Sequence, residues 1–207
     1  MRRTGRNRRG GKAVSSQKSA VLRRKAGPGA PPKRPARPAL WDRLELEKVG
    51  IVRLEGLRVV FLPASTLTDI EAAGERILGR GLGAILHEAG LRTGRDIALF
   101  ALGTAGTASP EAILRFMESG HADRGYGEVS FPSSDLANGS LVARVNDSPY
   151  AESGGPRRST ACYFPLGFWV GFVGSMSGKT VTGAETQCRA KGAAFCEFSI
   201  LPTPPSS

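Results

Sequence analysis

The spacing of apolar residues predicts mainly helices in the first part of the chain. The short apolar run LRVVFLP (57–63) is typical of a buried strand that stops at Pro63. From Ser65 onward, apolar residues recur every three or four positions, which predicts a helix. After a glycine cluster the helical pattern continues over residues 78–90, and a further helix is predicted over residues 96–102.

The segment SPEAILRFMESG (109–120) carries the clearest helix signals. Ser109 is suited to cap the first turn, and Pro110 suits the first helical position because an N–H there would lack a partner anyway. Glu111 interacts favourably with the positive end of the helix, and Gly120 is predicted to end it.

Beyond this helix the apolar pattern changes to that of strands. GEVSF (127–131) and LVARV (141–145) are strand-like, and PSSDLANG (132–139) between them has the composition of a turn. Residues 150–159 are predicted to form a loop, followed by one aromatic-rich helix and a terminal hairpin. This order of elements predicts an α+β fold in which helices pack on a twisted antiparallel sheet.

The positive charge of the chain is concentrated at its N-terminus. Thirteen of the 29 Lys and Arg residues fall within residues 1–40, which contain no Asp or Glu and few large apolar side chains. Such a segment cannot bury enough surface to offset the entropy of ordering, so we predict a disordered basic tail. The tail lacks the apolar stretch of a secretory signal. It is either a polyanion-binding arm, for nucleic acid or an anionic membrane, or a solubilising extension.

Residues 41–207 have the length of a single domain. No stretch approaches the ~20 consecutive apolar residues that cross a bilayer, so no transmembrane segment is predicted. The three cysteines are an odd number, which fits a disulfide framework poorly. They favour a reducing compartment, the cytoplasm, with the thiolates on a metal.

Two glycine-rich segments resemble nucleotide-binding loops but lack the required context. GKT (178–180) would end a phosphate loop only if a glycine occupied position 173, where the chain has Val173. Gly178 is therefore predicted to end the aromatic-rich helix. The glycines within residues 79–83 follow a helix, whereas a dinucleotide-binding fingerprint follows a strand.

The C-terminal cysteines are candidate metal ligands. Strand-like segments on either side of the turn RAKGAA (189–194) predict a hairpin that brings Cys188 and Cys196 together. Glu185 can join them if the strand bends or ends there, because on a straight strand it would point to the opposite face. With Cys162 the set comprises three thiolates and one carboxylate, which suits tetrahedral zinc. The alternative is that the cysteines are simply buried core residues.

Residues 161–200, ACYFPLGFWVGFVGSMSGKTVTGAETQCRAKGAAFCEFSI, resemble the C-terminal part of the 4-vinyl reductase domain family. The shared features are a cysteine, an aromatic-rich helix ending in glycine, an E-x-x-C segment, a glycine turn and a Cys-x-Phe before the last strand. The resemblance extends more weakly back to about residue 55. In phenol-sensing members the matching residues bind zinc, which implies that the zinc ligands here are Cys162, Glu185, Cys188 and Cys196.

The resemblance also implies a small-molecule-binding domain, similar in fold to trafficking-complex subunits and often a homodimer. The aromatic-rich helix offers Phe168, Trp169 and Phe172 as lining for a small aromatic or hydrocarbon ligand, although such residues also serve as core. His121, just past a predicted helix end, either caps the helix or faces the ligand pocket.

The sequence therefore favours a zinc-stabilised domain that binds a small hydrophobic or aromatic ligand and acts as a sensor or carrier. One alternative is an enzyme or accessory factor of chlorophyll-type tetrapyrrole vinyl reduction, which the family name implies and which the missing nicotinamide and flavin motifs disfavour. A second is a regulator that uses the basic tail on nucleic acid or an anionic membrane. His87 and His121 lie in no acid–base motif, so nothing in the sequence indicates catalysis.

Overall fold

The computed structural model describes residues 40–105, 109–152 and 162–204. Residues 40–207 form one compact unit. The predicted tail lies outside the described residues apart from Leu40, and so does the predicted loop beyond Glu152. No helix among the described residues combines the length and apolar character needed to cross a membrane.

The described chain begins with a small antiparallel sheet. After the 3-10 turn Leu40–Arg43, the strands β1 (Leu44–Lys48), β2 (Ile51–Leu54) and β3 (Leu57–Val59) pair in the order β1-β2-β3. The predicted buried strand over residues 57–63 was wrong in extent, because β3 ends at Val59 and residues 60–62 are exposed. β3 is an edge strand with one neighbour, and the chain leaves it toward Pro63, whose ring restricts the preceding backbone.

Three helices follow this sheet: α1 (Ala64–Leu78), α2 (Gly81–Ala105) and α3 (Pro110–Asp123). The helices predicted separately over residues 78–90 and 96–102 form the single helix α2, which starts after Gly79 breaks α1 with a positive φ of 55°. Ser109 caps α3 as predicted, by accepting a hydrogen bond from the Ala112 N–H at 3.4 Å. The prediction that Gly120 ends this helix was wrong, because α3 continues for three further residues to Asp123.

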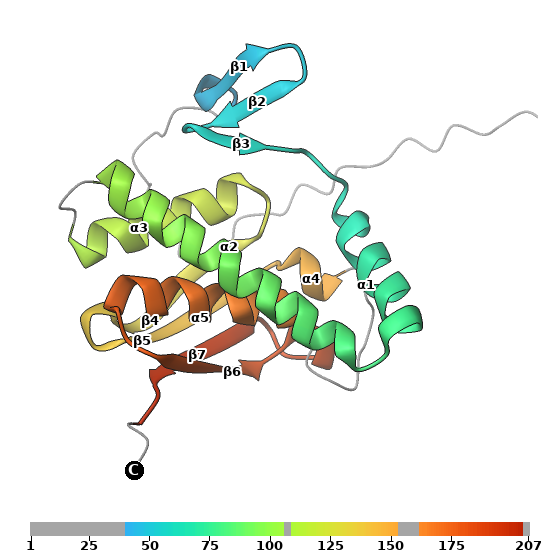
Figure 1. Ribbon diagram of the computed structural model, residues 1–207, viewed down its shortest axis with the longest axis vertical. Helices are drawn as coiled ribbons and strands as arrows, with labels where there is room; N and C mark the ends of the chain where they lie inside the picture. The colour runs from blue at the N-terminus through green and yellow to red at the C-terminus, as the bar shows by residue number, and fades with distance from the viewer. Residues whose placement is uncertain (1–39, 106–108, 153–161, 205–207) are drawn as a thin grey trace, which may run out of the picture. The chain divides into compact units, whose positions relative to one another are not determined.

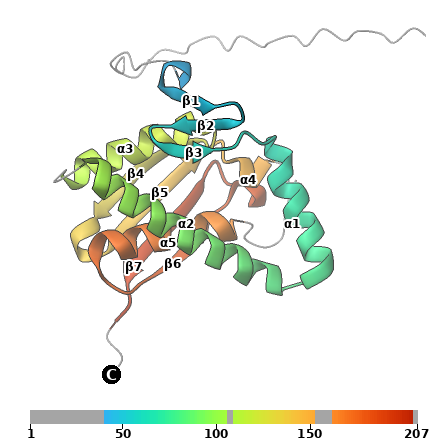
Figure 2. The same cartoon turned by 45° about the horizontal axis from the view of Figure 1, so that its top comes forward.

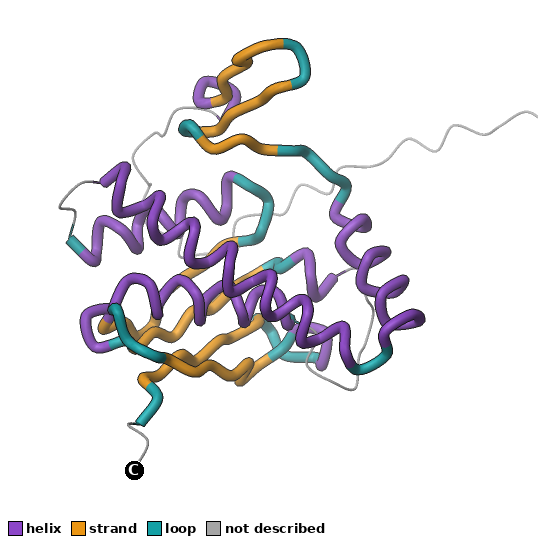
Figure 3. The backbone as a smooth tube through the Cα atoms, viewed as in Figure 1, coloured by secondary structure: helices purple, strands orange, loops and turns teal. Residues whose placement is uncertain are grey.

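The second half of the chain builds a four-stranded antiparallel sheet with the order β4-β5-β7-β6 (Figure 3). Its elements are β4 (Glu128–Asp135), β5 (Ser140–Asn146), α4 (Pro149–Glu152), α5 (Tyr163–Ser177), β6 (Val181–Gln187) and β7 (Cys196–Pro202). The predicted hairpin is β6–β7, and Gly178 in the left-handed conformation ends α5 as predicted. Helices packed on an antiparallel sheet confirm the α+β prediction.

Two segments predicted as turn or loop contain regular structure. β4 continues through Pro132 to Asp135, so most of PSSDLANG is strand and the turn is confined to Leu136–Gly139. Pro132 is tolerated because β4 is an edge strand whose register shifts between Ser130 and Ser133. The start of the predicted loop over residues 150–159 belongs to the short helix α4.

Helix α5 lies between the four-stranded sheet and α2 (Figures 1 and 2). Glycines on both helices let their backbones touch. A Cβ added at Gly94 of α2 would stand 2.0 Å from the Phe168 carbonyl oxygen, and one added at Gly167 of α5 would stand 2.1 Å from the His87 carbonyl oxygen. Gly90 and Gly171 make equivalent contacts, so the close approach runs along both helices. A central helix covered on both sides explains why α5 is apolar all round.

The core is built mainly where α5 meets the sheet. The largest fully buried side chains include Trp169, Phe172 and Val173 of α5 with Leu141, Phe198 and Ile200 of β5 and β7. Gly183 of β6 leaves room for this packing, because a Cβ there would meet Ile200, Val170 and Leu166. The N-terminus of α5 and the β6–β7 hairpin thereby come together at one end of the core.

Candidate functional site

The three cysteines and Glu185 meet at this end of the core. One ligand atom from each of Cys162, Glu185, Cys188 and Cys196 lies within 4.8 Å of the others. Cys162 immediately precedes α5, Glu185 lies in β6, Cys188 follows β6, and Cys196 begins β7. Residues from three separate parts of the sequence thus converge on a single point.

A register irregularity in β6 lets Glu185 and Cys188 face the same point. On a regular strand, residues three apart point to opposite faces. The pairing of β6 with β7 shifts between Glu185 and Gln187, which inserts an extra residue on the β6 side. The bend reverses the alternation, so the Cys188 side chain is buried with that of Glu185. The condition that the sequence placed on Glu185 is met.

The four side chains have the chemistry of a cation site. Both oxygens of Glu185 are buried and have no hydrogen-bond partner among the described residues. A buried carboxylate without a partner is costly, and a bound cation would remove that cost. The Sγ atoms of Cys162 and Cys196 are 3.8 Å apart. This separation is too long for a disulfide and matches the ~3.8 Å edge of a tetrahedron with metal–sulfur bonds of about 2.3 Å. The four residues therefore fit a tetrahedral, thiolate-rich metal ion.

The surroundings favour negative charge on sulfur. The backbone N–H of Arg189 donates to Cys196 Sγ at 3.5 Å. A hydrogen bond from Cys162 lowers the pKa of Cys196 to about 7, and the same interaction raises the pKa of Cys162. Cys162 also stands at the positive end of the α5 dipole, which stabilises a thiolate. These features help to assemble the deprotonated ligands that a metal requires.

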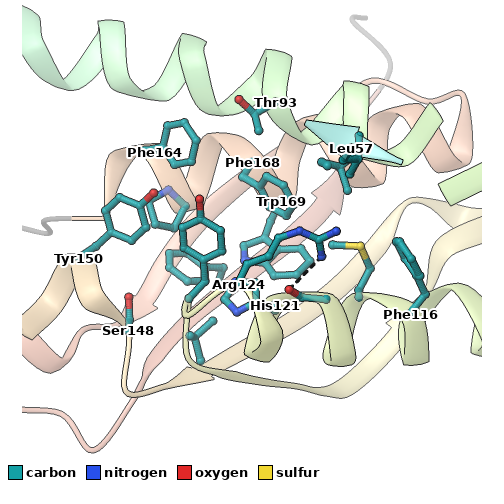
Figure 4. Close-up of a pocket in the computed structure, with 17 residues that line it drawn as sticks. Leu57, Thr93, Phe116, His121, Arg124, Ser148, Tyr150, Phe164, Phe168 and Trp169 are labelled. Carbon is teal, nitrogen blue, oxygen red and sulfur yellow. Dashed lines mark hydrogen bonds between the residues drawn. The ribbon is translucent and has the colours of Figure 1, made fainter. Parts of the chain in front are cut away.

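A cavity of about 160 Å³ opens beside the same helix (Figure 4). Its walls come from α2, α3, α5, two strands of the large sheet and Leu57 of β3. Aromatic side chains dominate the lining: Phe116, Tyr126, Tyr150, Phe164, Phe168, Trp169 and Phe198. An engineered cavity of about 150 Å³ lined by apolar side chains holds one benzene molecule. The space here corresponds to a single ring.

Of the residues that the sequence nominated for a ligand pocket, three line this cavity. Phe168, Trp169 and His121 are part of its wall. The ring of Phe172 is fully buried behind them and packs on Phe168 and Trp169, with centroids 6.4 Å and 6.0 Å away. His87 lies on α2, half buried, and does not line the cavity.

His121 is a neutral hydrogen-bond acceptor inside the apolar wall. Burial lowers its pKa to about 4, so the ring is uncharged near neutral pH. Nδ1 lies 3.1 Å from the Gly127 carbonyl oxygen, which can only accept, so Nδ1 carries the proton. Nε2 is then the unprotonated nitrogen and can accept a hydrogen bond. The ring is held by stacking on Trp169 at 5.9 Å between centroids.

Several cavity residues escaped the sequence analysis. Tyr126, Tyr150 and Arg124 come from connecting segments or helix ends. Arg124 follows α3 directly, and Tyr150 belongs to the short helix α4. No periodicity signals such positions, since only the folded chain brings them to one cavity.

Comparison with known proteins agrees with this arrangement. Residues 141–202 match the family model of the 4-vinyl reductase domain, which confirms the resemblance for a segment that contains Glu185, Cys188 and Cys196. A solved structure titled as the phenol-responsive sensory domain of the transcription activator PoxR with phenol is 21% identical. It has a TM-score of 0.68, with 79% of this chain and 86% of that chain covered. This likeness shows a shared fold.

A second solved structure is that of a vinyl-4-reductase family protein from Methanocaldococcus jannaschii. It is 14% identical with a TM-score of 0.48, and the match covers 70% of this chain and 84% of that chain. No curated protein matches the sequence.

Proposed function

We propose that this protein is a zinc-stabilised binding domain for a small, single-ring aromatic molecule and acts as a sensor or carrier. The observation that carries the proposal is the enclosed aromatic cavity of about 160 Å³, which has the size of one ring. The fold shared with the sensory domain of PoxR, a structure with phenol, supports the same class of ligand.

Zinc is the metal that the donor set favours. Thiolates select zinc over magnesium and calcium, and four protein ligands leave no open position, which is typical of structural zinc. The role we propose for Cys162, Glu185, Cys188 and Cys196 is to fasten the N-terminus of α5 to the β6–β7 hairpin. Elemental analysis of protein purified under reducing conditions is expected to find about one zinc per chain.

Ligand recognition would combine shape with one oriented acceptor. The rings of Phe168 and Trp169 provide an apolar wall, and Nε2 of His121 is available to accept a hydrogen bond from a ligand hydroxyl. Such a site distinguishes a phenol from a plain hydrocarbon by the partner that it offers to the hydroxyl.

Calorimetric titration with phenol and toluene tests this function. The intact protein is expected to bind both, and His121→Phe is expected to lower phenol affinity about 5- to 10-fold while leaving toluene affinity unchanged. The phenylalanine keeps an aromatic ring against Trp169 and removes the acceptor. His87→Phe is the matched control, because His87 lies outside the cavity lining. Folded, zinc-loaded protein that binds neither compound would contradict the proposal.

The alternative of tetrapyrrole vinyl reduction is disfavoured by size. A tetrapyrrole contains four pyrrole rings, whereas the enclosed cavity has the volume of about one ring. The alternative of a regulator that contacts polyanions through residues 1–40 rests on the charge of that segment alone, nearly all of which lies outside the described residues.

We also propose that the protein is a homodimer that uses the outer face of α1. The buried residues of this helix are polar, Thr68 and Glu71, while Ile70 and Ile77 are exposed by 55% and 80%. The apolar face thus points outward, and the exposed Phe61 just before the helix extends it. Light scattering coupled to size-exclusion chromatography is expected to report a dimer that Ile77→Glu converts to a monomer. An unchanged mass would refute this interface.

A further inference from the structure

Arg124 places a cationic donor in the wall of the aromatic cavity. Its side chain is only 19% exposed, and Nη1 donates to the Gly120 carbonyl oxygen at 3.0 Å (Figure 4). Nη2 is buried and has no hydrogen-bond partner among the described residues. A buried donor without a partner is unfavourable, so Nη2 is a position where a ligand acceptor would be stabilised.

The nearest opposite charge does not satisfy this donor. Nη2 lies 3.8 Å from Oε2 of Glu55, which is an ion pair beyond hydrogen-bond distance. Oε2 is itself buried and without a hydrogen bond among the described residues, while Oε1 of Glu55 accepts from Arg43. Arg43 also binds Asp123, so the group contains two guanidinium and two carboxylate groups. The charges balance, yet one N–H of Arg124 stays available.

The end of α3 is shaped to hold the guanidinium in this place. A Cβ added at Gly120 would stand 2.4 Å from Nη1 of Arg124. Only a glycine therefore leaves room for the arginine to fold back over the last turn and reach the cavity. This use of Gly120 also explains why the residue occurs inside the helix rather than at its end.

We propose that Arg124 selects ligands in which the ring carries an acceptor oxygen, as a carboxylate or a carbonyl group. This inference rests on the proposed function and specifies its ligand class. In an apolar cavity a few placed polar groups fix orientation. Arg124 offers a donor and His121 an acceptor, so the two ends of the polar lining recognise opposite groups. A ring with both a hydroxyl and a carboxyl or carbonyl group has the chemistry to use both.

The test is calorimetric titration of the full-length, zinc-loaded protein with toluene, benzamide and benzoate. These probes have similar shapes and carry no acceptor, a neutral carbonyl and an anionic carboxylate, respectively. The variants are Arg124→Met, which keeps much of the side-chain volume, and Gly120→Ala, which displaces the guanidinium and leaves its charge in place. Glu55→Gln removes the competing carboxylate near Nη2 without altering the cavity lining.

We expect benzamide, benzoate or both to bind the unmodified protein about 10- to 100-fold more tightly than toluene. Arg124→Met and Gly120→Ala should remove this preference and leave toluene affinity unchanged. Glu55→Gln should raise benzoate affinity relative to benzamide. A preference for benzoate alone identifies an anionic ligand, and a preference for both identifies a neutral acceptor oxygen.

The inference is overturned if toluene binds as tightly as both oxygen-bearing probes, or if the variants weaken all three probes equally. In either case toluene binding still supports a small-ligand cavity, so the proposed function survives. If toluene, phenol and the oxygen-bearing probes all fail to bind folded protein, the proposed function fails together with the inference.

Discussion

Replacing Glu185 by Gln is expected to change stability in opposite directions with and without metal. Both oxygens of Glu185 are buried without a hydrogen-bond partner among the described residues, and three thiols surround them. Without a cation, this unpaired carboxylate costs about 3 kcal/mol or more, because nothing offsets its lost hydration. With a cation bound, the carboxylate is a ligand. The same substitution should therefore remove a cost in one state and a favourable interaction in the other.

The magnitudes follow from these two roles. In metal-free, reduced protein, Glu185→Gln should raise the free energy of unfolding by about 1–3 kcal/mol, since a neutral amide is less costly to bury than a charge. In zinc-loaded protein, a weakening of metal affinity by 10- to 100-fold should lower the free energy of unfolding by about 1.4–2.8 kcal/mol at fixed excess zinc.

Urea denaturation with excess zinc, and separately with a chelator and a thiol reductant, measures both values. Glu197→Gln is the matched control, because Glu197 lies in β7 one residue after Cys196 and is bound by Arg144 and Thr186. The control should be destabilised by a similar amount in both conditions. If Glu185→Gln also shifts stability equally and in the same direction in both, Glu185 is not a ligand and the metal-site argument fails.

Three further predictions concern the helix pair, the buried histidine and the tail. Gly94→Ala should lower the free energy of unfolding by about 3 kcal/mol in urea, because the new Cβ would meet the Phe168 carbonyl oxygen at 2.0 Å. Gly103→Ala on the same helix meets nothing within 4 Å and should be neutral or stabilising by up to about 1 kcal/mol. The pKa of His121 is lowered from 6.5 to about 4, so the unfolded chain binds more protons in this range. Stability should be full above pH 6.5 and fall by up to about 3 kcal/mol as the pH drops to 4, and His121→Phe should remove this component from the difference between the two pH profiles. Deletion of residues 1–39 should leave zinc content and phenol affinity unchanged in elemental analysis and calorimetry, and a loss of either would assign the tail a role in the site.

The sequence by itself was sufficient for features that depend on neighbouring residues. The cap at Ser109, the end of α5 at Gly178 and the β6–β7 hairpin follow from local backbone chemistry, and the structure agrees with each of them. The proximity of Cys162 to Glu185 and the hairpin cysteines was also anticipated, through the family resemblance rather than through spacing.

Errors arose where distant packing overrides local preference. Gly94 looks like an interruption between two helices, yet the contact with α5 favours a glycine there and α2 runs through it. Gly120 looks like a helix end, yet it makes room for Arg124. The outward apolar face of α1 has no counterpart in a simple rule that places apolar residues inside.

Local sequence determined which side chains are available for a site, because a residue's chemistry and its backbone preferences travel with it along the chain. Tertiary structure alone decided their relations: the bulge that turns Cys188 toward Glu185, the cavity formed by segments far apart in sequence, and the donor of Arg124 within it. Such relations depend on distances between atoms that many intervening residues separate. They become defined only when burial of the core makes one arrangement of those segments more stable than the rest.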